Sequence, residues 1–149
     1  DGEVIFTRDI PVGGFNYTNE ISKEMGISFA EAESLKLGAC AGHEVPEEVH
    51  NIIKNTNQSV SDEIRNSFDF FIASNSGVNI SRIYFTGGSS AVPGFIELLS
   101  HEVSLPAEGI NPFMRVVANP KIFNSHYLKQ IAPFVSVVMG LGLRQVGDS

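Results

Sequence analysis

The fold is decided by residues 80–103, ISRIYFTGGSSAVPGFIELLSHEV. The first part, Ile80–Thr86, is a short apolar segment rich in β-branched and aromatic residues, which favour strands. Gly87 and Gly88 follow at once, and a helix is predicted from about Pro93 to Val103, because proline is well tolerated in the first helical turn. The sequence therefore predicts a strand, a glycine turn and a helix in direct succession, which is a unit of an α/β fold.

Three helices are predicted before this unit. The first runs from Tyr17 to Met25 and stops at Gly26, a residue that readily ends a helix. The second starts at Ser28 with the serine–glutamate spacing of a capping box and ends at about Gly38. The third, residues 46–74, has apolar side chains mostly at three- and four-residue intervals, which is the pattern of a long amphipathic helix.

The two ends of the chain are predicted as a strand and a buried helix. Glu3–Ile10 alternates apolar and polar residues, and Asp1-Gly2 before it is typical of a turn, so we expect the second arm of a hairpin whose first arm is not in the sequence. Its free edge would favour strand exchange or a homodimer. Residues 105–117 are predicted as a short strand and a loop. His126–Val146 contains a helix that is apolar on nearly every side, so we expect it to be buried.

Composition restricts the class of protein. The 149 residues suit one domain, and 42% hydrophobic against 18% charged residues predicts a folded chain. A net charge of −7 argues against nucleic acid as a partner, because phosphate backbones require clustered Lys and Arg. The longest apolar run, 131–143, is shorter than the ~20 residues of a bilayer span. The single cysteine, Cys40, favours a reducing, cytoplasmic setting.

Two sets of residues are candidates for ligand binding. Gly87, Gly88 and Ser89 form a turn that would let a flat ligand approach the backbone, because glycines lack a Cβ atom. The structural alternative is a turn that only brings strand and helix together. Glu33 and Lys36 share a helical face, where the carboxylate would accept ribose hydroxyls and the ammonium would donate to sugar or phosphate oxygens. The alternative for this pair is a solvated ion pair.

No catalytic or metal-binding residue is predicted. The four histidines lack the spacing of a metal site and are expected at the surface, and Asp9 is expected to be a hydrogen-bonding or surface residue. Ser89 and Ser90 do not fit the pattern of a serine nucleophile. The histidines are His43, His50, His101 and His126.

Five motifs, in order along nearly the whole chain, resemble the PilM family of type IV pilus assembly proteins. The last of them resembles the closing helix of that family. The motifs are Phe6–Gly14, Glu31–Lys36, Tyr84–Gly94, Asn111–Phe113 and the segment Tyr127–Arg144 with its Ile131-Ala132-Pro133 and Met139–Arg144 parts.

The resemblance implies an actin-like ATPase fold related to the division protein FtsA, in which two RNase H-like domains close on ATP and magnesium. Residues 1–149 would be most of the second domain, incomplete at its N-terminal strand. In the family, residues matching Glu33 and Lys36 approach the ribose and base, and those matching Gly87, Gly88 and Ser89 lie against the adenosine. Ser89 stands where the family commonly has a third glycine, so it would narrow the nucleotide site or supply a hydroxyl.

The resemblance also implies a function. The intact protein would be a cytoplasmic scaffold, peripheral to the inner membrane, that binds ATP between its domains and holds the tail of the membrane protein PilN in its first domain. An Asp-Ile-Gly phosphate loop and that first domain would precede Asp1, so the segment alone is expected to have little ATPase activity. Two alternatives stay open: an interaction module of a division or secretion complex without nucleotide binding, and a fragment of a sugar-kinase-like enzyme.

Overall fold

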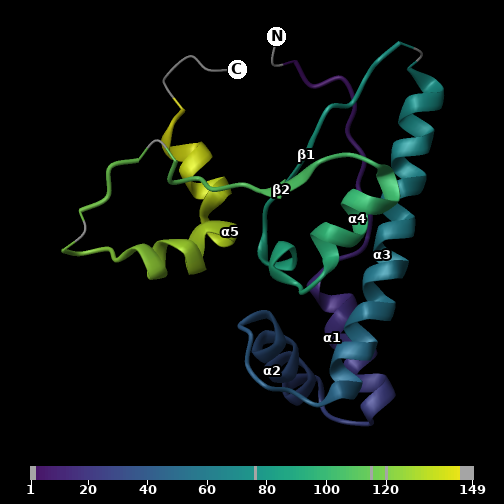
Figure 1. Ribbon diagram of the computed structural model, residues 1–149, viewed down its shortest axis with the longest axis vertical. Helices are drawn as coiled ribbons and strands as arrows, with labels where there is room; N and C mark the ends of the chain where they lie inside the picture. Colours follow the sequence, from purple (N-terminus) through teal and green to yellow (C-terminus); the bar gives the residue numbers. More distant parts are fainter. Residues whose placement is uncertain (1–2, 76, 115, 120, 145–149) are drawn as a thin grey trace.

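The computed structural model describes residues 3–75, 77–114, 116–119 and 121–144. Helix α3 forms a long spine, with α1 and α2 at one of its ends and α4 and the two strands beside it (Figure 1). The elements in chain order are α1 Gly14–Met25, α2 Phe29–Cys40, α3 Glu47–Ser74, β1 Ile83–Phe85, the 3₁₀ turn η1 Gly88–Ala91, α4 Phe95–Val103, β2 Ala107–Gly109 and α5 Ser125–Gly142.

The first three helices confirm the predictions from the sequence. Helix α1 ends at Gly26, whose φ of 65° is left-handed. Helix α2 opens with the expected capping box, in which the Ser28 hydroxyl accepts the Glu31 N–H and the Glu31 carboxylate accepts the Ser28 N–H. Helix α1 begins at Gly14, earlier than predicted, because the Asn16 side chain accepts the Gly13 N–H at 2.8 Å and so caps the first turn.

The predicted strand, glycine turn and helix form one unit. Strand β1 pairs in parallel with β2, with Ile83 opposite Ala107 and Phe85 opposite Gly109, and α4 makes the connection between them. This confirms an α/β arrangement, because parallel neighbours require such a crossover. Strand β1 is shorter than the predicted Ile80–Thr86, since its pairing with β2 spans only three residues of each strand.

The hydrophobic core lies between α1, α2, α3 and the start of α4. A buried hydrogen-bond chain crosses it: the Tyr17 hydroxyl donates to Asn57 Oδ1 at 2.8 Å, and Asn57 Nδ2 donates to the Pro93 carbonyl at 2.9 Å. This chain ties α1 and α3 to the loop before α4. The buried apolar residues of the core are Tyr17, Ile21, Ala32, Ala39, Val49, Ile52, Ile53, Val60, Val92 and Phe95.

Replacing Tyr17 with phenylalanine should lower the free energy of unfolding by about 1.5 kcal/mol, because the buried Asn57 oxygen loses its donor. Urea unfolding of the intact protein measures the change. Burial also raises the pKa of Tyr17, so the wild type should lose stability as the pH rises above about 10, and the variant should lose less. Tyr84→Phe, at a side chain that is 60% exposed, is the control; equal losses for the two variants would contradict the prediction.

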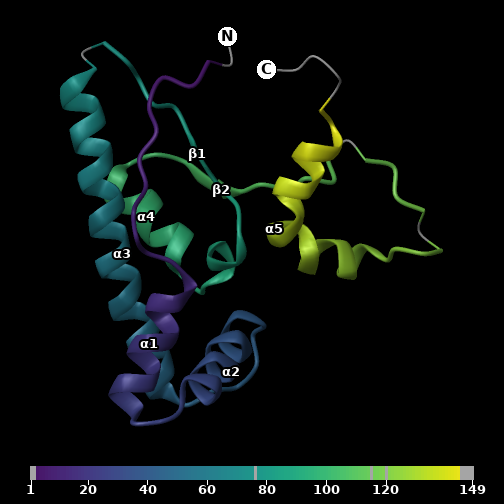
Figure 2. The same ribbon diagram turned by 180° about the vertical axis from the view of Figure 1, so that it is seen from behind.

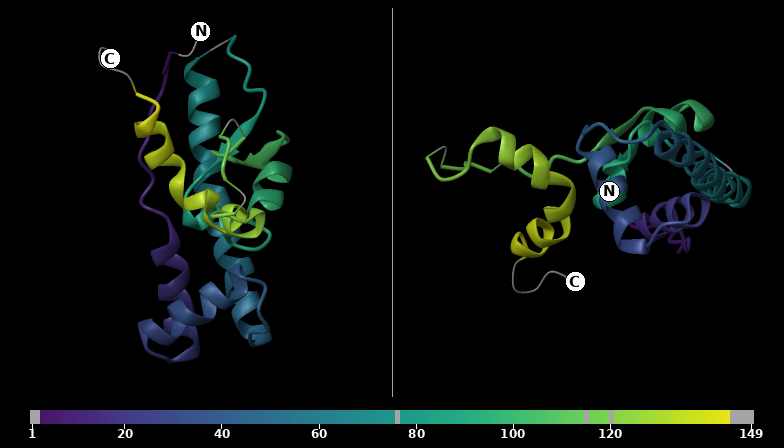
Figure 3. Two further views of the ribbon diagram at one scale, coloured as in Figure 1. Left: turned by 90° about the vertical axis from the view of Figure 1, so that its left-hand side faces the viewer. Right: turned by 90° about the horizontal axis from the view of Figure 1, so that it is seen from below.

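The prediction of a buried closing helix is wrong. Helix α5 stands apart from the core (Figure 2, Figure 3), and Ala132 is its only buried residue among those the structure describes. Its bend follows from Pro133, which lies inside the helix and cannot donate a backbone hydrogen bond. No described helix has both the length and the hydropathy to cross a membrane. The exposed large hydrophobic side chains of α5 are Tyr127, Phe134, Val137, Val138 and Leu141.

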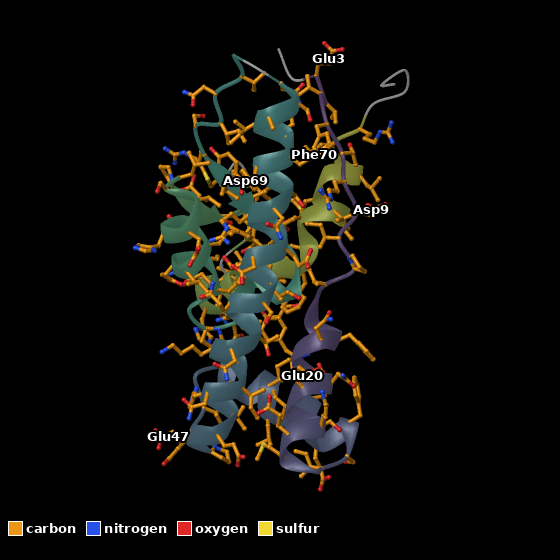
Figure 4. The ribbon with its side chains drawn as sticks, turned by 90° about the vertical axis from the view of Figure 1, so that its right-hand side faces the viewer. Glu3, Asp9, Glu20, Glu47, Asp69 and Phe70 are labelled. Carbon is orange, nitrogen blue, oxygen red and sulfur yellow. The ribbon has the colours of Figure 1, made fainter. Side chains whose placement is uncertain are left out.

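The prediction of a strand at Glu3–Ile10 is also wrong. The segment is extended along α3, but no described residue forms a ladder with it, and a strand requires a hydrogen-bonded neighbour (Figure 4). Side-chain contacts hold it instead. The ring centroids of Phe6 and Phe71 lie 5.3 Å apart, and Cζ of Arg8 lies 5.9 Å from the ring centroid of Phe70. Homodimerisation through this edge stays a prediction, which light scattering tests.

Candidate functional site

The glycine turn follows β1 directly. Gly87 has φ 93° and ψ 162°, a backbone conformation that is essentially reserved for glycine, and the space beside its Cα is open. The Ser90 hydroxyl donates to the Gly87 carbonyl at 2.7 Å and fixes the turn. A cavity of about 310 Å³ lies next to it, with Gly87, Gly88 and Ser89 in its wall.

The turn and helix α2 meet at Gly14, the first residue of α1. A Cβ atom placed on Gly14 would lie 3.4 Å from Lys36 Nζ and 3.5 Å from Ser89 Oγ. Lys36 and Ser89 are far apart in the sequence, yet both polar groups approach the same point. The structure therefore brings the second candidate set beside the first.

Lys36 is buried, with a side chain only 9% exposed, and all its hydrogen-bond donors are used. Its Nζ atom donates to the Gly14 carbonyl at 3.1 Å, to Thr18 Oγ1 at 2.8 Å and to Glu33 Oε2 at 2.7 Å. An ammonium has three N–H groups, so this set satisfies it. The interpretation as a solvated ion pair is therefore wrong for Lys36, although the ion pair with Glu33 does form.

Sequence reasoning missed Gly14 and Thr18. The Thr18 hydroxyl contacts both the Gly14 carbonyl and Glu33 Oε2. Their four-residue spacing on α1 was a usable signal, because it places both on one helical face. Neither residue type suggested by itself that the face would hold a buried ammonium.

Glu33 is the exposed member of this cluster, with a side chain 37% exposed. The hydrogen bond from Lys36, followed by the one from Thr18, lowers the pKa of the Glu33 carboxyl. Its negative charge is thus held in place at the surface by Lys36 and Thr18. An anchored carboxylate of this kind can accept hydroxyl groups.

The lowered pKa of Glu33 predicts acid sensitivity. In the unfolded chain a glutamate has a pKa of about 4.3, and above this pH the ionised Glu33 carboxylate stabilises the folded protein. This contribution should be lost as the pH falls through the lower pKa that Glu33 has in the folded protein. Glu33→Gln should therefore make stability less dependent on pH below about 5. Urea midpoints at several pH values for both proteins measure this; parallel curves would show that Glu33 does not carry the effect.

Helix α5 also contacts the glycine turn. The Gly87 N–H donates to the Pro133 carbonyl at 2.8 Å. A Cβ atom on Gly88 would lie 2.9 Å from Cε1 of Phe134, so this aromatic ring occupies the space that a side chain would need. Sequence reasoning expected a ligand against Gly88 and missed Phe134, because it treated the closing helix as core.

The remaining candidates lie outside this site. His43, His50, His101 and His126 are all exposed, as predicted, and so is Asp9. Among the described residues, no group of three or more His, Cys, Asp or Glu side chains is arranged to hold a metal ion.

This fold, with the glycine turn beside a buried lysine, is similar to that of a solved structure from type IV pilus biogenesis. One chain of a solved PilM-PilN type IV pilus biogenesis complex matches it with a TM-score of 0.75 and 27% sequence identity. The match covers 91% of this chain and 37% of that chain.

The sequence pattern of the type IV pilus assembly protein PilM matches residues 1–146, and the chain belongs to this family. The resemblance predicted from the sequence is thereby confirmed.

Proposed function

We propose that this chain is most of the second, RNase H-like domain of an actin-like protein, and that its site holds the adenosine side of ATP. The observation that carries the proposal is the convergence of Lys36 and Ser89 on Gly14. Two groups from distant parts of the chain form one polar wall there. Glu33 lies at the exposed side of that wall.

The residues present fit a nucleoside. Hydrogen bonds from Lys36 and Thr18 go to Oε2 of Glu33, and Oε1 of this half-exposed side chain is the acceptor we assign to the ribose hydroxyls. The Ser89 hydroxyl and the open side of Gly87 complete the contact. In this proposal Lys36 does not touch the ligand; it positions Glu33.

The described residues do not fit the metal. They contain no group of three or more His, Cys, Asp or Glu side chains placed to hold a metal ion, and we assign the metal and the phosphates to the first domain of the intact protein. When bound there, magnesium would neutralise phosphate charge. We therefore expect residues 1–149 alone to have little ATPase activity, which a phosphate-release assay against the intact protein tests.

The proposed setting is a cytoplasmic scaffold for type IV pilus assembly, peripheral to the inner membrane. Membership of the PilM family and the likeness to a PilM-PilN complex support this role. The proposed partner is a PilN-type inner-membrane protein, bound through the first domain.

Replacing Glu33 with glutamine should weaken ATP binding to the intact protein about tenfold, or 1.4 kcal/mol, because a neutral amide replaces the charged carboxylate that accepts the ribose hydroxyls. Calorimetry with ATP and with 2′,3′-dideoxy-ATP separates the ribose from the rest of the nucleotide. The wild type should bind ATP more tightly than the dideoxy compound, and the variant should bind the two with equal affinity, as in a double-mutant cycle.

Glu24→Ala, at another exposed carboxylate, is the control and should leave both affinities unchanged. An equal preference for ATP over the dideoxy compound in wild type and Glu33→Gln would remove Glu33 from the site.

Two observations favour an alternative, an interaction module without nucleotide binding. Lys36 has no donor left for a ligand, and the Phe134 ring already fills the space beside Gly88. In this alternative the turn and the lysine are purely architectural. The absence of ATP binding by the intact wild-type protein would decide in its favour.

A further inference from the structure

Phe134 is an exposed aromatic side chain in a fixed position. The residue is 64% exposed, yet the carbonyl group of its neighbour Pro133 is anchored. The Pro133 carbonyl accepts the Gly87 N–H at 2.8 Å and the Thr86 hydroxyl at 3.4 Å. The ring therefore stays beside the glycine turn while most of its surface faces solvent.

The ring meets Gly88 with an edge. The ring atoms nearest to the Cβ position of Gly88 are Cε1 at 2.9 Å, Cδ1 at 3.6 Å and Cζ at 3.7 Å. These are neighbours along one edge, and the two outer atoms recede from the glycine. An edge contact of this kind leaves the faces of the ring available, and ring faces are the surfaces on which nucleobases stack.

The position of Phe134 fits a base whose ribose lies at Glu33. Gly88 contacts the ring, and the next residue, Ser89, faces Gly14 and Lys36. The turn thus has α5 near it through Gly88 and α2 near it through Ser89; in Figure 1, α5 lies to one side of the segment between β1 and α4, and α2 lies below that segment. A nucleoside crossing the turn would have its sugar on the α2 side and its base on the α5 side.

We propose that Phe134 is the platform on which the base of the bound nucleotide stacks, so that the site selects ligands with an aromatic base. The inference rests on the proposed function and adds its base-recognition residue. It also explains Gly88: the glycine is required for the approach of the ring, and the ring in turn meets the ligand.

The test measures binding of ATP and of ribose 5′-triphosphate, which has no base, to the intact protein. Phe134→Ala should weaken ATP binding about tenfold or more and leave binding of ribose 5′-triphosphate unchanged. Phe134→Trp should keep the affinity for ATP, whereas Phe134→Leu, which still packs on Gly88, should behave like the alanine variant. Phe70→Ala, at another exposed phenylalanine (55%), is the matched control and should bind both ligands as the wild type does.

The tryptophan variant supplies a second readout. Residues 1–149 contain no natural tryptophan. In Phe134→Trp, ATP should therefore quench the added indole emission of residue 134, so that the quench exceeds any seen in the intact wild type, and ribose 5′-triphosphate should not cause this excess. Thermal unfolding without nucleotide shows that each variant is folded.

The outcomes distinguish this inference from the proposed function. Wild-type affinity for ATP in Phe134→Ala, or full rescue by leucine, would overturn the stacking role while the Glu33 result stands. Failure of the wild type to bind either compound would overturn both.

Discussion

Replacing Lys36 with methionine should lower the free energy of unfolding of the intact protein by about 3 kcal/mol, the lower end of the range for breaking a buried ion pair. Methionine has a similar length but no donors, so the Gly14 carbonyl and the Glu33 carboxylate lose the ammonium at 3.1 and 2.7 Å. The loss stays at the lower end because Glu33 is 37% exposed and water can reach it. Urea unfolding followed by circular dichroism measures the change.

The chain contains a matched control for this substitution. Lys23 also pairs with a glutamate three residues away, Glu20, but the two groups are 3.8 Å apart and the lysine side chain is 73% exposed. Lys23→Met should change stability by less than about 0.5 kcal/mol, as is usual for surface pairs. Similar losses for both lysines would show that burial of Lys36 does not decide its contribution.

The same pair of lysines shows what sequence could and could not predict. Both lysines have a glutamate at i−3, and helical spacing alone cannot tell them apart. What separates them is α1, which presents the Gly14 carbonyl and Thr18 to Lys36. That contact depends on how α1 and α2 pack, and packing between helices is not encoded in the spacing along either one.

Local signals predicted the elements well. The capping box at Ser28, the stop at Gly26 and the apolar period of α3 each depend on neighbours in sequence, and each was confirmed. The prediction of a strand at Glu3–Ile10 was wrong because a strand requires a hydrogen-bonded partner, and the hairpin arm expected to supply it is not in the sequence. The prediction that α5 is buried was wrong for a related reason. An apolar helix indicates that the helix has a surface able to pack, but not which part of the protein packs against it.

The site was predicted in its members but not in their roles. The sequence indicated Glu33, Lys36, Gly87, Gly88 and Ser89, and the structure brings Lys36 and Ser89 to the same point beside Gly14. The structure also shows that Lys36 is buried and that Gly88 has an aromatic neighbour. Neither fact could be predicted from the spacing of residues along the sequence. The two glycines of the turn consequently differ: Gly88 is required by a neighbouring ring, and Gly87 by its own backbone.

This difference predicts a large effect at Gly87. Its φ of 93° and ψ of 162° lie in a region that is essentially closed to other residues, and holding an alanine there costs on the order of 1–3 kcal/mol. No atom lies within 4 Å of the Cβ position, so the loss would come from backbone strain alone. We expect Gly87→Ala to lower the free energy of unfolding by about 2 kcal/mol, or to shift the turn and lengthen the hydrogen bond to Pro133.

Gly13→Ala is the control, because Gly13 also has open space at its Cβ position but its φ of 179° is extended backbone that any residue adopts. This variant should be neutral or more stable by up to about 1 kcal/mol, since alanine restricts the unfolded chain. Amide hydrogen exchange at Gly87 and its neighbours would show whether the turn itself has loosened. Equal stability of Gly87→Ala and Gly13→Ala would contradict the prediction. It would mean that the turn does not have the backbone conformation of φ 93° and ψ 162° at Gly87, and the contact between Phe134 and Gly88 would then need a different explanation.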